Sequence, residues 1–392
     1  MKLDLLYELQ PLPRPWARPH PYGQRDAEQK IYEDAFEQVE LADRLGFQTA
    51  WFVEHHFRDG RSASATPEAV LGGLSRVTRD IRLGFGVTLM PFGFTHPARV
   101  AEKVATVDIM SRGRVEWGTG RSTPMEQVAF GVPIDERSKE QWREAVEIVV
   151  GMWERERFSW DSPNFHFPER VQTPKPFQDP HPPAWMAASS ERSVDLAGSL
   201  GLGLLYFTLL QPLEKTREHI ATYRAAVARS SGQLTRTWND RVGVYTLVHC
   251  YDDEDEAAAY GLWDSVGWWY RNWAEFLLEW ELPELTEAER ETTFPLLKPL
   301  LQESGIAVDI SKYQETDMII CGTPEHVLEK MIRYSEAGVD QLLCYIQFGD
   351  LPHDKVMHNL ELLATKVMPE LERRGHRTTA TATTPTPELT SQ

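Results

Sequence analysis

The sequence is poor in cysteine and has no long apolar run. Its 392 residues include three cysteines, Cys250, Cys321 and Cys344, and none belongs to a CxxC pair. This excludes a dense disulfide framework and disfavours a thiolate metal site. No window approaches the roughly 18 apolar residues of a membrane span, and no basic segment followed by an apolar stretch opens the chain. We therefore expect a folded cytoplasmic protein with reduced core cysteines.

Positive charge is also in deficit. The chain has 41 Lys and Arg against 59 Asp and Glu, for a net charge of -18, which argues against nucleic acid or an anionic membrane surface as the main partner. No GxGxxG motif follows the first apolar segment, which disfavours a Rossmann fold. No HExxH motif or Cys/His spacing completes a metal site, so we expect no metal.

Strand-like and helix-like segments alternate along the chain. Eight apolar segments have the length and composition of buried strands: residues 3–9, 49–53, 81–90, 114–118, 184–188, 202–207, 242–250 and 341–348. Each is matched with a segment of helical periodicity, and several of these begin at a proline: residues 29–46, 67–79, 97–110, 138–155, 190–200, 212–230, 324–337 and 353–373. This pattern predicts an α/β protein with a single (β/α)8 TIM barrel.

Three segments stand outside the alternation. Residues 158–176 are rich in aromatic residues and proline, and they predict an excursion after the fourth helix that contains a short hairpin. Residues 253–311 are acidic and hold five of the 13 tryptophans, which predicts a long helical insertion between strands seven and eight. Residues 377–392 are rich in threonine and proline with nothing to bury, so we expect a disordered tail after a barrel of residues 1–376.

Ionisable groups gather at the end of the second strand. Apolar residues 49–53 are followed at once by Glu54, His55 and His56. Because a TIM barrel carries its active site at the carboxyl ends of its strands, this cluster is a candidate catalytic rim. In isolation, an exposed loop pair of histidines is the plainer interpretation, and a zinc site would lack its remaining ligands.

Strands four and five end in residues suited to an anion. Gly120 permits close approach of a ligand to the backbone, and Arg121 can form two parallel hydrogen bonds to a phosphate. Ser189, Ser190 and Ser193 stand where a helix begins, and the free N–H groups and hydroxyls there also attract an anion. An ordinary capping box is the alternative for the serines. On neighbouring strands the two segments would form a phosphate clamp.

Glycine is unexpected inside the third strand, where Gly84 and Gly86 occur. Such glycines mark a bulge or a place where a flat ligand meets the backbone. Tight packing against a bulky neighbour explains them equally well, so both interpretations stay open.

Together these segments resemble the bacterial luciferase-like family of flavin-dependent monooxygenases over nearly the whole chain. The order and spacing of nine motifs carry the resemblance: Gly46-Phe47, residues 51–57, 83–91, His96-Pro97, residues 110–114, 118–121, 188–193, 322–325 and 367–369. The resemblance implies a barrel that binds reduced FMN, reacts it with O2 and uses the flavin hydroperoxide on an organic substrate. His55 matches the family's catalytic histidine, with Glu54 orienting it or holding its charge and His56 in support.

The cofactor-binding positions that follow from the resemblance and the strand ends are Gly86, Val87, Gly120, Arg121, Ser189, Ser190 and Ser193. Arg121, Ser190 and Ser193 match positions that hold the FMN phosphate. Gly86-Val87 falls where the family has a non-proline cis peptide beneath the isoalloxazine ring. Gly120 and Ser189 stand where the luciferase α chain has a reactive cysteine and a glutamate, so light emission is not implied.

For the substrate we expect a hydrophobic carbonyl compound or natural-product intermediate, bound by the strand-end aromatic residues Tyr7, Tyr206, Phe207 and Phe348. Baeyer-Villiger oxygen insertion and aldehyde oxidation both stay open. Nothing in the chain suggests its own nicotinamide domain, so a separate flavin reductase would supply the reduced FMN. The resemblance also implies a dimer, taken here as a homodimer, through the helices at 67–79 and 97–110.

Two other functions fit the same features. One is a deazaflavin-dependent dehydrogenase on the same barrel, which would move hydride without oxygen. The other is a non-catalytic flavin-binding subunit. The histidine pair and the aromatic insertion favour the oxygenase, and the presence of His55 together with the phosphate clamp argues against the inactive subunit.

Overall fold

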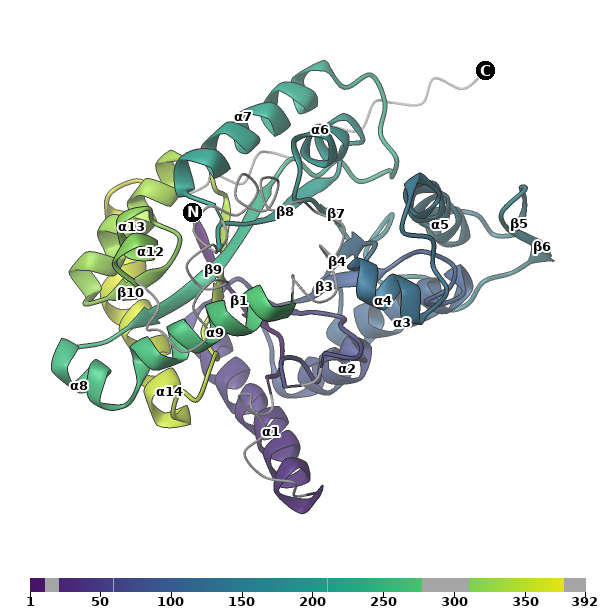
Figure 1. Ribbon diagram of the computed structural model, residues 1–392. Helices are drawn as coiled ribbons and strands as arrows, with labels where there is room; N and C mark the ends of the chain where they lie inside the picture. The colour runs from purple at the N-terminus through teal and green to yellow at the C-terminus, as the bar shows by residue number, and fades with distance from the viewer. Residues whose placement is uncertain (11–20, 59, 210, 277–309, 377–392) are drawn as a thin grey trace.

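In this computed structural model we describe residues 1–10, 21–58, 60–209, 211–276 and 310–376. Parallel strands form a closed ring surrounded by helices (Figure 1), and the predicted TIM barrel is confirmed. The ring closes because β8 pairs with β9 and β11 pairs with β1. Its strands, in order around the ring, are β1 (Lys2–Tyr7), β2 (Thr49–Phe52), β3 (Arg82–Leu89), β4 (Val115–Gly120), β7 (Ala184–Ala187), β8 (Gly203–Phe207), β9 (Val242–Cys250) and β11 (Gln341–Tyr345).

The helices that cover the ring follow the predicted segments, except that α1 begins at residue 21 and not at residue 29. Proline occupies the first turn of α2, α3 and α13. The backbone N–H groups of a first helical turn have no acceptor within the helix, so the lack of an N–H group in proline costs no hydrogen bond there. No helix of the described ranges is long and apolar enough to cross a membrane. The covering helices are α1 (Pro21–Leu45), α2 (Pro67–Val77), α3 (Pro97–Ser111), α5 (Glu136–Glu154), α6 (Glu191–Ser199), α7 (Leu213–Arg229), α13 (Pro324–Glu336) and α14 (His353–Leu362), which continues through the π-helical turn η2 (Leu363–Val367) into α15 (Met368–Arg373).

The excursion after α5 contains the expected hairpin, formed by β5 (Phe158–Asp161) and β6 (His166–Arg170). Two short elements were not predicted. The helix α4 (Pro124–Ala129) follows β4, and the strand β10 (Ile320–Gly322) pairs with the far end of β9 outside the ring. Both are too short to show a period in the sequence.

The insertion predicted at 253–311 begins with two helices, α8 (Glu254–Ala259) and α9 (Leu262–Phe276). The short helix α12 (Ile310–Glu315) follows the gap in the description. Residues 277–309 of the insertion and the predicted tail at 377–392 lie outside the described residues. The described part packs onto the barrel, since Trp269 and Tyr270 of α9 are buried.

Buried polar groups close the barrel near the amino ends of its strands. The Asp4 carboxylate accepts hydrogen bonds from Trp51 Nε1 and Gln341 Nε2, each at 2.7 Å. Opposite them, Glu116 accepts from Trp185 Nε1 at 2.6 Å and pairs with Arg241 at 2.9 Å. Burial raises the pKa of Asp4 to about 7. With this end filled, a ligand of the barrel would bind at the carboxyl ends of the strands.

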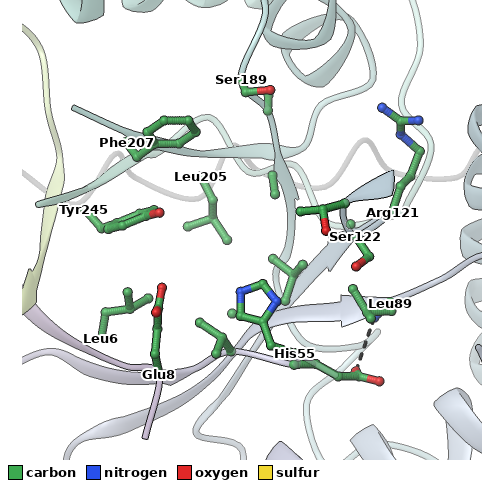
Figure 2. Close-up of a pocket in the computed structure, with 18 of the residues that line it drawn as sticks. Leu6, Glu8, His55, Leu89, Arg121, Ser122, Ser189, Leu205, Phe207 and Tyr245 are labelled. Atoms are coloured by element: carbon green, nitrogen blue, oxygen red, sulfur yellow. Dashed lines mark hydrogen bonds between the residues drawn. The ribbon is translucent and has the colours of Figure 1, made fainter. Parts of the chain in front are cut away.

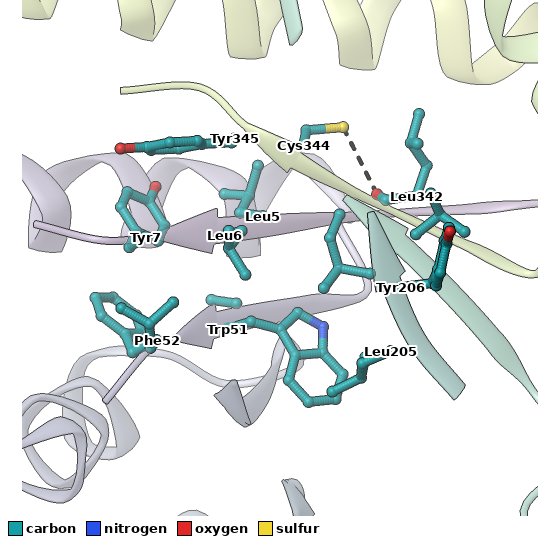
Figure 3. Close-up of a cluster of buried hydrophobic side chains, with 14 of the residues drawn as sticks. Leu5, Leu6, Tyr7, Trp51, Phe52, Leu205, Tyr206, Leu342, Cys344 and Tyr345 are labelled. Atoms are coloured by element: carbon teal, nitrogen blue, oxygen red, sulfur yellow. Dashed lines mark hydrogen bonds between the residues drawn. The ribbon is translucent and has the colours of Figure 1, made fainter. Parts of the chain in front are cut away.

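Of the two glycines inside β3, Gly84 is explained by tight packing against a bulky neighbour. A Cβ atom added to Gly84 would lie 2.3 Å from two ring atoms of Trp51. Trp51 is fully buried and tied to Asp4, so its indole ring has little room to move. The side chains around Trp51 are shown in Figure 3.

We predict that Gly84→Ala lowers the free energy of unfolding by about 1–3 kcal/mol, because the added methyl group overpacks a fixed neighbour. Urea denaturation followed by tryptophan fluorescence measures this. Gly232→Ala is the matched control, since its Cβ would meet no described atom within 4 Å. Equal unfolding midpoints for the two variants would contradict the packing interpretation.

Candidate active site

A cavity of about 570 Å³ opens at the carboxyl ends of the strands, and its wall is formed by residues of seven strands of the ring and of the segment that follows β2. Figure 2 shows Arg121 and Glu8 on opposite sides of it, with His55 between them. Most of the predicted site residues line this cavity. They are Glu54, His55, Gly86, Val87, Gly120, Arg121, Ser189, Tyr206 and Phe207.

Two aromatic residues expected at the substrate site do not line the cavity. Leu6 and Glu8 point inward from β1, so Tyr7 between them faces the helices, where it stacks on Phe52 with ring centroids 4.9 Å apart (Figure 3). Phe348 is fully buried and packs edge-on against Tyr345. Both are core residues, and their predicted substrate contacts are corrected accordingly.

Tyr206 lines the cavity, but its hydroxyl group does not act there. The hydroxyl lies 2.5 Å from His219 Nδ1 on α7 and donates to Gln211 Oε1 at 3.2 Å. Burial raises the pKa of Tyr206 well above its usual range. Tyr206 therefore anchors α7, while its neighbours Leu205 and Phe207 on β8 present apolar side chains to the cavity.

His55 is held by a carboxylate that the sequence did not single out. Its Nδ1 lies 3.2 Å from Oε1 of Glu126 on α4, and the same oxygen accepts the backbone N–H of His56 at 2.5 Å. Glu126 is completely buried. Its other oxygen accepts hydrogen bonds from the remaining donors around it, Arg58 Nη2 at 3.3 Å, Thr123 Oγ1 at 3.2 Å and Ser122 Oγ.

These donors keep Glu126 ionised. Burial alone would raise the pKa of this carboxyl, but the charge and hydrogen bond of His55, with Arg58 and Ser122, together outweigh burial and hold the pKa well below its usual range. An ionised Glu126 accepts a hydrogen bond from Nδ1–H of His55. The proton is therefore on Nδ1, and Nε2 does not contact Glu126.

Glu54 has a different role from the one expected. Its Oε2 accepts a hydrogen bond from the backbone N–H of Leu89 at 3.2 Å and lies 3.6 Å from Lys103 Nζ. Its Oε1 lies 3.6 Å from His56 Nε2. Glu54 therefore orients His56 and the end of β3, whereas Glu126 orients His55. The His56 ring packs edge-on against Phe130, 4.8 Å away, and does not line the cavity.

A sequence signal for Glu126 exists. Thr123 stands at the N-cap position of α4, Pro124 follows it and Glu126 is the third helical residue, which is the sequence pattern of a capping box, although the Thr123 side chain makes no cap hydrogen bond. We missed it because α4 has only six residues. The carboxylate then turns away from the helix start and toward the end of β2.

Two residues of the predicted phosphate clamp, Arg121 and Ser189, line the cavity, whereas Ser190 and Ser193 do not. Arg121 Nη1 donates to Ser138 Oγ at 2.9 Å, and burial lowers the pKa of Arg121 while Glu136 opposes that shift. Ser190 and Ser193 form the capping box that was the alternative interpretation, with Ser190 N donating to Ser193 Oγ at 3.0 Å. The serines thus cap α6 beside the cavity, and Ser189 at its wall is exposed.

Gly86, Val87 and Gly120 form part of the cavity wall. The Gly86–Val87 peptide bond is cis, as the resemblance implied. Gly120 faces it from β4, where an added Cβ would come within 2.5 Å of Val87 Cγ2.

We predict that Glu126→Gln lowers the free energy of unfolding at pH 7 by about 2 kcal/mol, the scale of lost hydrogen bonds to a charged group. Because the folded-state pKa of Glu126 is depressed, its ionisation stabilises the fold above the unfolded pKa of about 4.3, and this contribution is lost as the pH falls below that value. The difference between the two proteins should therefore shrink in acid. Urea titrations from pH 7 to pH 3 measure it.

The control for this prediction is Glu147→Gln, which removes a carboxylate that pairs with Arg143 at the surface of α5. A change of less than about 0.5 kcal/mol is expected there. A pH-independent difference between wild type and Glu126→Gln would contradict the buried, ionised state of Glu126.

The family described as luciferase-like monooxygenase matches residues 15–341. The flavin-dependent trigonelline monooxygenase, oxygenase component, of Acinetobacter baylyi is 24% identical over 357 residues, covering 88% of this chain and 91% of that protein. The F420-dependent glucose-6-phosphate dehydrogenase of Beutenbergia cavernae is 26% identical over 354 residues, covering 89% and 96%. The oxygenating constituent of 3,6-diketocamphane monooxygenase from Pseudomonas putida, solved in complex with FMN, has a TM-score of 0.73 at 18% identity and covers 94% of this chain and 99% of that one. The chain therefore belongs to the luciferase-like monooxygenase family of oxidoreductases.

Proposed function

We propose that this protein is the oxygenase component of a two-component monooxygenase, which takes reduced FMN from a separate flavin reductase and oxygenates a hydrophobic organic substrate. One observation carries the proposal. The wall of one cavity contains Arg121 and Ser189, which suit a phosphate, and also the imidazole of His55, which is fixed by a buried carboxylate. The relative named as an oxygenase component supports the need for a reductase partner.

The residues of the clamp fit FMN. Arg121 and Ser189 would hold the phosphate with help from Ser190 and Ser193 at the start of α6, where free backbone N–H groups favour an anion. The cis Gly86–Val87 bond and Gly120 would support the flavin ring. Reduced FMN, when bound, supplies the electrons with which O2 is activated.

His55 would act on protons in this site. With Nδ1 held by Glu126, its Nε2 is the atom that would give or take a proton. Arg58 and Thr123 keep Glu126 in place. A fixed imidazole also excludes water from the space it fills, which limits side reactions with the solvent.

The remaining wall indicates the substrate. Leu6, Leu205, Phe207 and Leu343 give it an apolar surface, which suits a hydrophobic aldehyde, ketone or natural-product intermediate. Tyr245 adds an aromatic ring beside Phe207, with centroids 5.7 Å apart.

We also propose a homodimer through α2 and α3. These helices pack on each other, and their outer side exposes Val77, Ile109 and Met110. Exposed apolar side chains on adjoining helices are suited to burial against a second copy of the chain.

The second candidate is a deazaflavin-dependent dehydrogenase, which the dehydrogenase relative favours. Cofactor binding separates the two. We predict micromolar binding of FMN in fluorescence titration, and a loss of about tenfold or more in Arg121→Ala because a charged hydrogen-bond partner of the phosphate is removed. Arg99→Ala, at a 71% exposed side chain on α3, is the control. Binding of the deazaflavin with no binding of FMN would reject the monooxygenase.

We further predict that His55→Ala releases hydrogen peroxide about 100-fold faster than wild type when the protein loaded with reduced FMN is mixed with O2, since a positioned acid or base contributes about 10²–10⁴-fold. Stopped-flow absorbance with a peroxide assay measures the rate. Glu126→Gln should move it in the same direction, and His166→Ala, on the exposed β5–β6 hairpin, should leave it unchanged. Equal rates for wild type and His55→Ala would remove the proposed role of His55.

A further inference from the structure

We propose that Glu8 and Arg61 form a specificity site for a hydrogen-bond donor on the substrate, so that the substrate is an apolar molecule carrying a neutral hydroxyl or N–H group. This rests on the proposed function and narrows its substrate class. Both residues line the cavity, and neither was singled out by the sequence.

The two side chains meet in a fork. Arg61 Nε donates to Glu8 Oε2 at 3.1 Å, and Arg61 Nη2 donates to Glu8 Oε1 at 3.2 Å. Ser62 Oγ donates to the Glu8 carbonyl at 2.6 Å and fixes the backbone. Burial alone would raise the pKa of Glu8, but the charge and hydrogen bonds of Arg61 outweigh it and lower the pKa, so the carboxylate is ionised.

The Glu8 carboxylate has acceptor capacity that the fork does not use. Each carboxylate oxygen has about two lone-pair directions, and each accepts one hydrogen bond from Arg61. Figure 2 shows the carboxylate pointing into the cavity between Tyr245 and His55. A donor on a bound molecule would meet it there.

The surroundings make this acceptor selective. Leu6, Leu205 and Leu343 line the same part of the cavity. A donor that enters an apolar space loses its water partners and needs a new acceptor, and a hydrogen bond to a charged group is stronger than one between neutral groups. Because the pair is neutral as a whole, it offers a cation little net attraction. The arrangement therefore favours a neutral donor.

The insertion completes this site. The Arg61 guanidinium lies 5.7 Å from the ring centroid of Trp269 on α9, which is almost completely buried. Arg61 is thus held between the barrel wall and the insertion. Because Arg61 also donates to Glu8, α9 is linked through Arg61 to the Glu8 carboxylate.

The test compares two ketones of similar shape. 4-Hydroxyacetophenone has a donor, while 4-methoxyacetophenone has an acceptor in its place. Calorimetric titration of protein loaded with oxidised FMN should give a dissociation constant at least about tenfold lower for the hydroxyl compound, which corresponds to about 1.4 kcal/mol. The double variant Glu8→Leu/Arg61→Met should lose this preference, and Asp317→Asn, which weakens a buried ion pair with Lys330 elsewhere, should keep it.

Replacing a buried ion pair with apolar residues of similar volume is often neutral for stability, so the double variant is expected to fold. If it does not, Glu8→Gln serves, and its preference should fall to about threefold because a neutral acceptor is weaker. Equal affinities in wild type, a preference retained without Glu8, or no binding of either ketone would overturn the inference.

The same titrations without FMN separate this inference from the proposed function. If the protein does not bind FMN but still prefers the hydroxyl compound in a way that depends on Glu8, the proposed cofactor is wrong and the inference of a specificity site stands. A protein that binds FMN through Arg121 but does not distinguish the ketones rejects the specificity site alone.

Discussion

The buried charge of Glu126 is the constraint on which the site depends. An ionised carboxylate without water is costly unless donors surround it. Here the donors come from the segment after β2, with His55, His56 and Arg58, and from the segment after β4, with Ser122 and Thr123. The two loops are therefore fixed to each other, and the direction of the His55 ring follows from this.

The barrel could be predicted because its signals are repeated. Apolar segments followed by helical periodicity, with proline at the helix starts, recur along the chain and agree with one another. A single short element does not repeat such a pattern, and α4 and β10 were therefore not predicted. Glu126 belongs to α4, so the same omission hid the partner of His55, and Glu54 was given that role because it is adjacent in sequence.

The second feature that the sequence did not predict was the direction of the side chains on the first strand. The first strand was predicted as an apolar run without assigning its two faces, so Tyr7 was placed in the cavity and Glu8 was overlooked. Period two in a strand puts neighbours on opposite faces, and the observed packing of Tyr7 on Phe52 sends Glu8 inward. Arg61 lies 53 residues from Glu8 in the chain, and no local pattern joins them.

Two parts of the cavity wall differ in the residues that form them, and this difference bears on substrate specificity. The part proposed to hold the cofactor includes the Gly86–Val87 peptide and Gly120, where an added Cβ would meet Val87, so substitutions at these glycines would disturb the barrel. The other part uses the side chains of Glu8, Arg61 and Tyr245, and Arg61 packs against Trp269 of the insertion. Changes in α9 can therefore alter the surroundings of Glu8 and Arg61 while the contact between His55 and Glu126 stays the same.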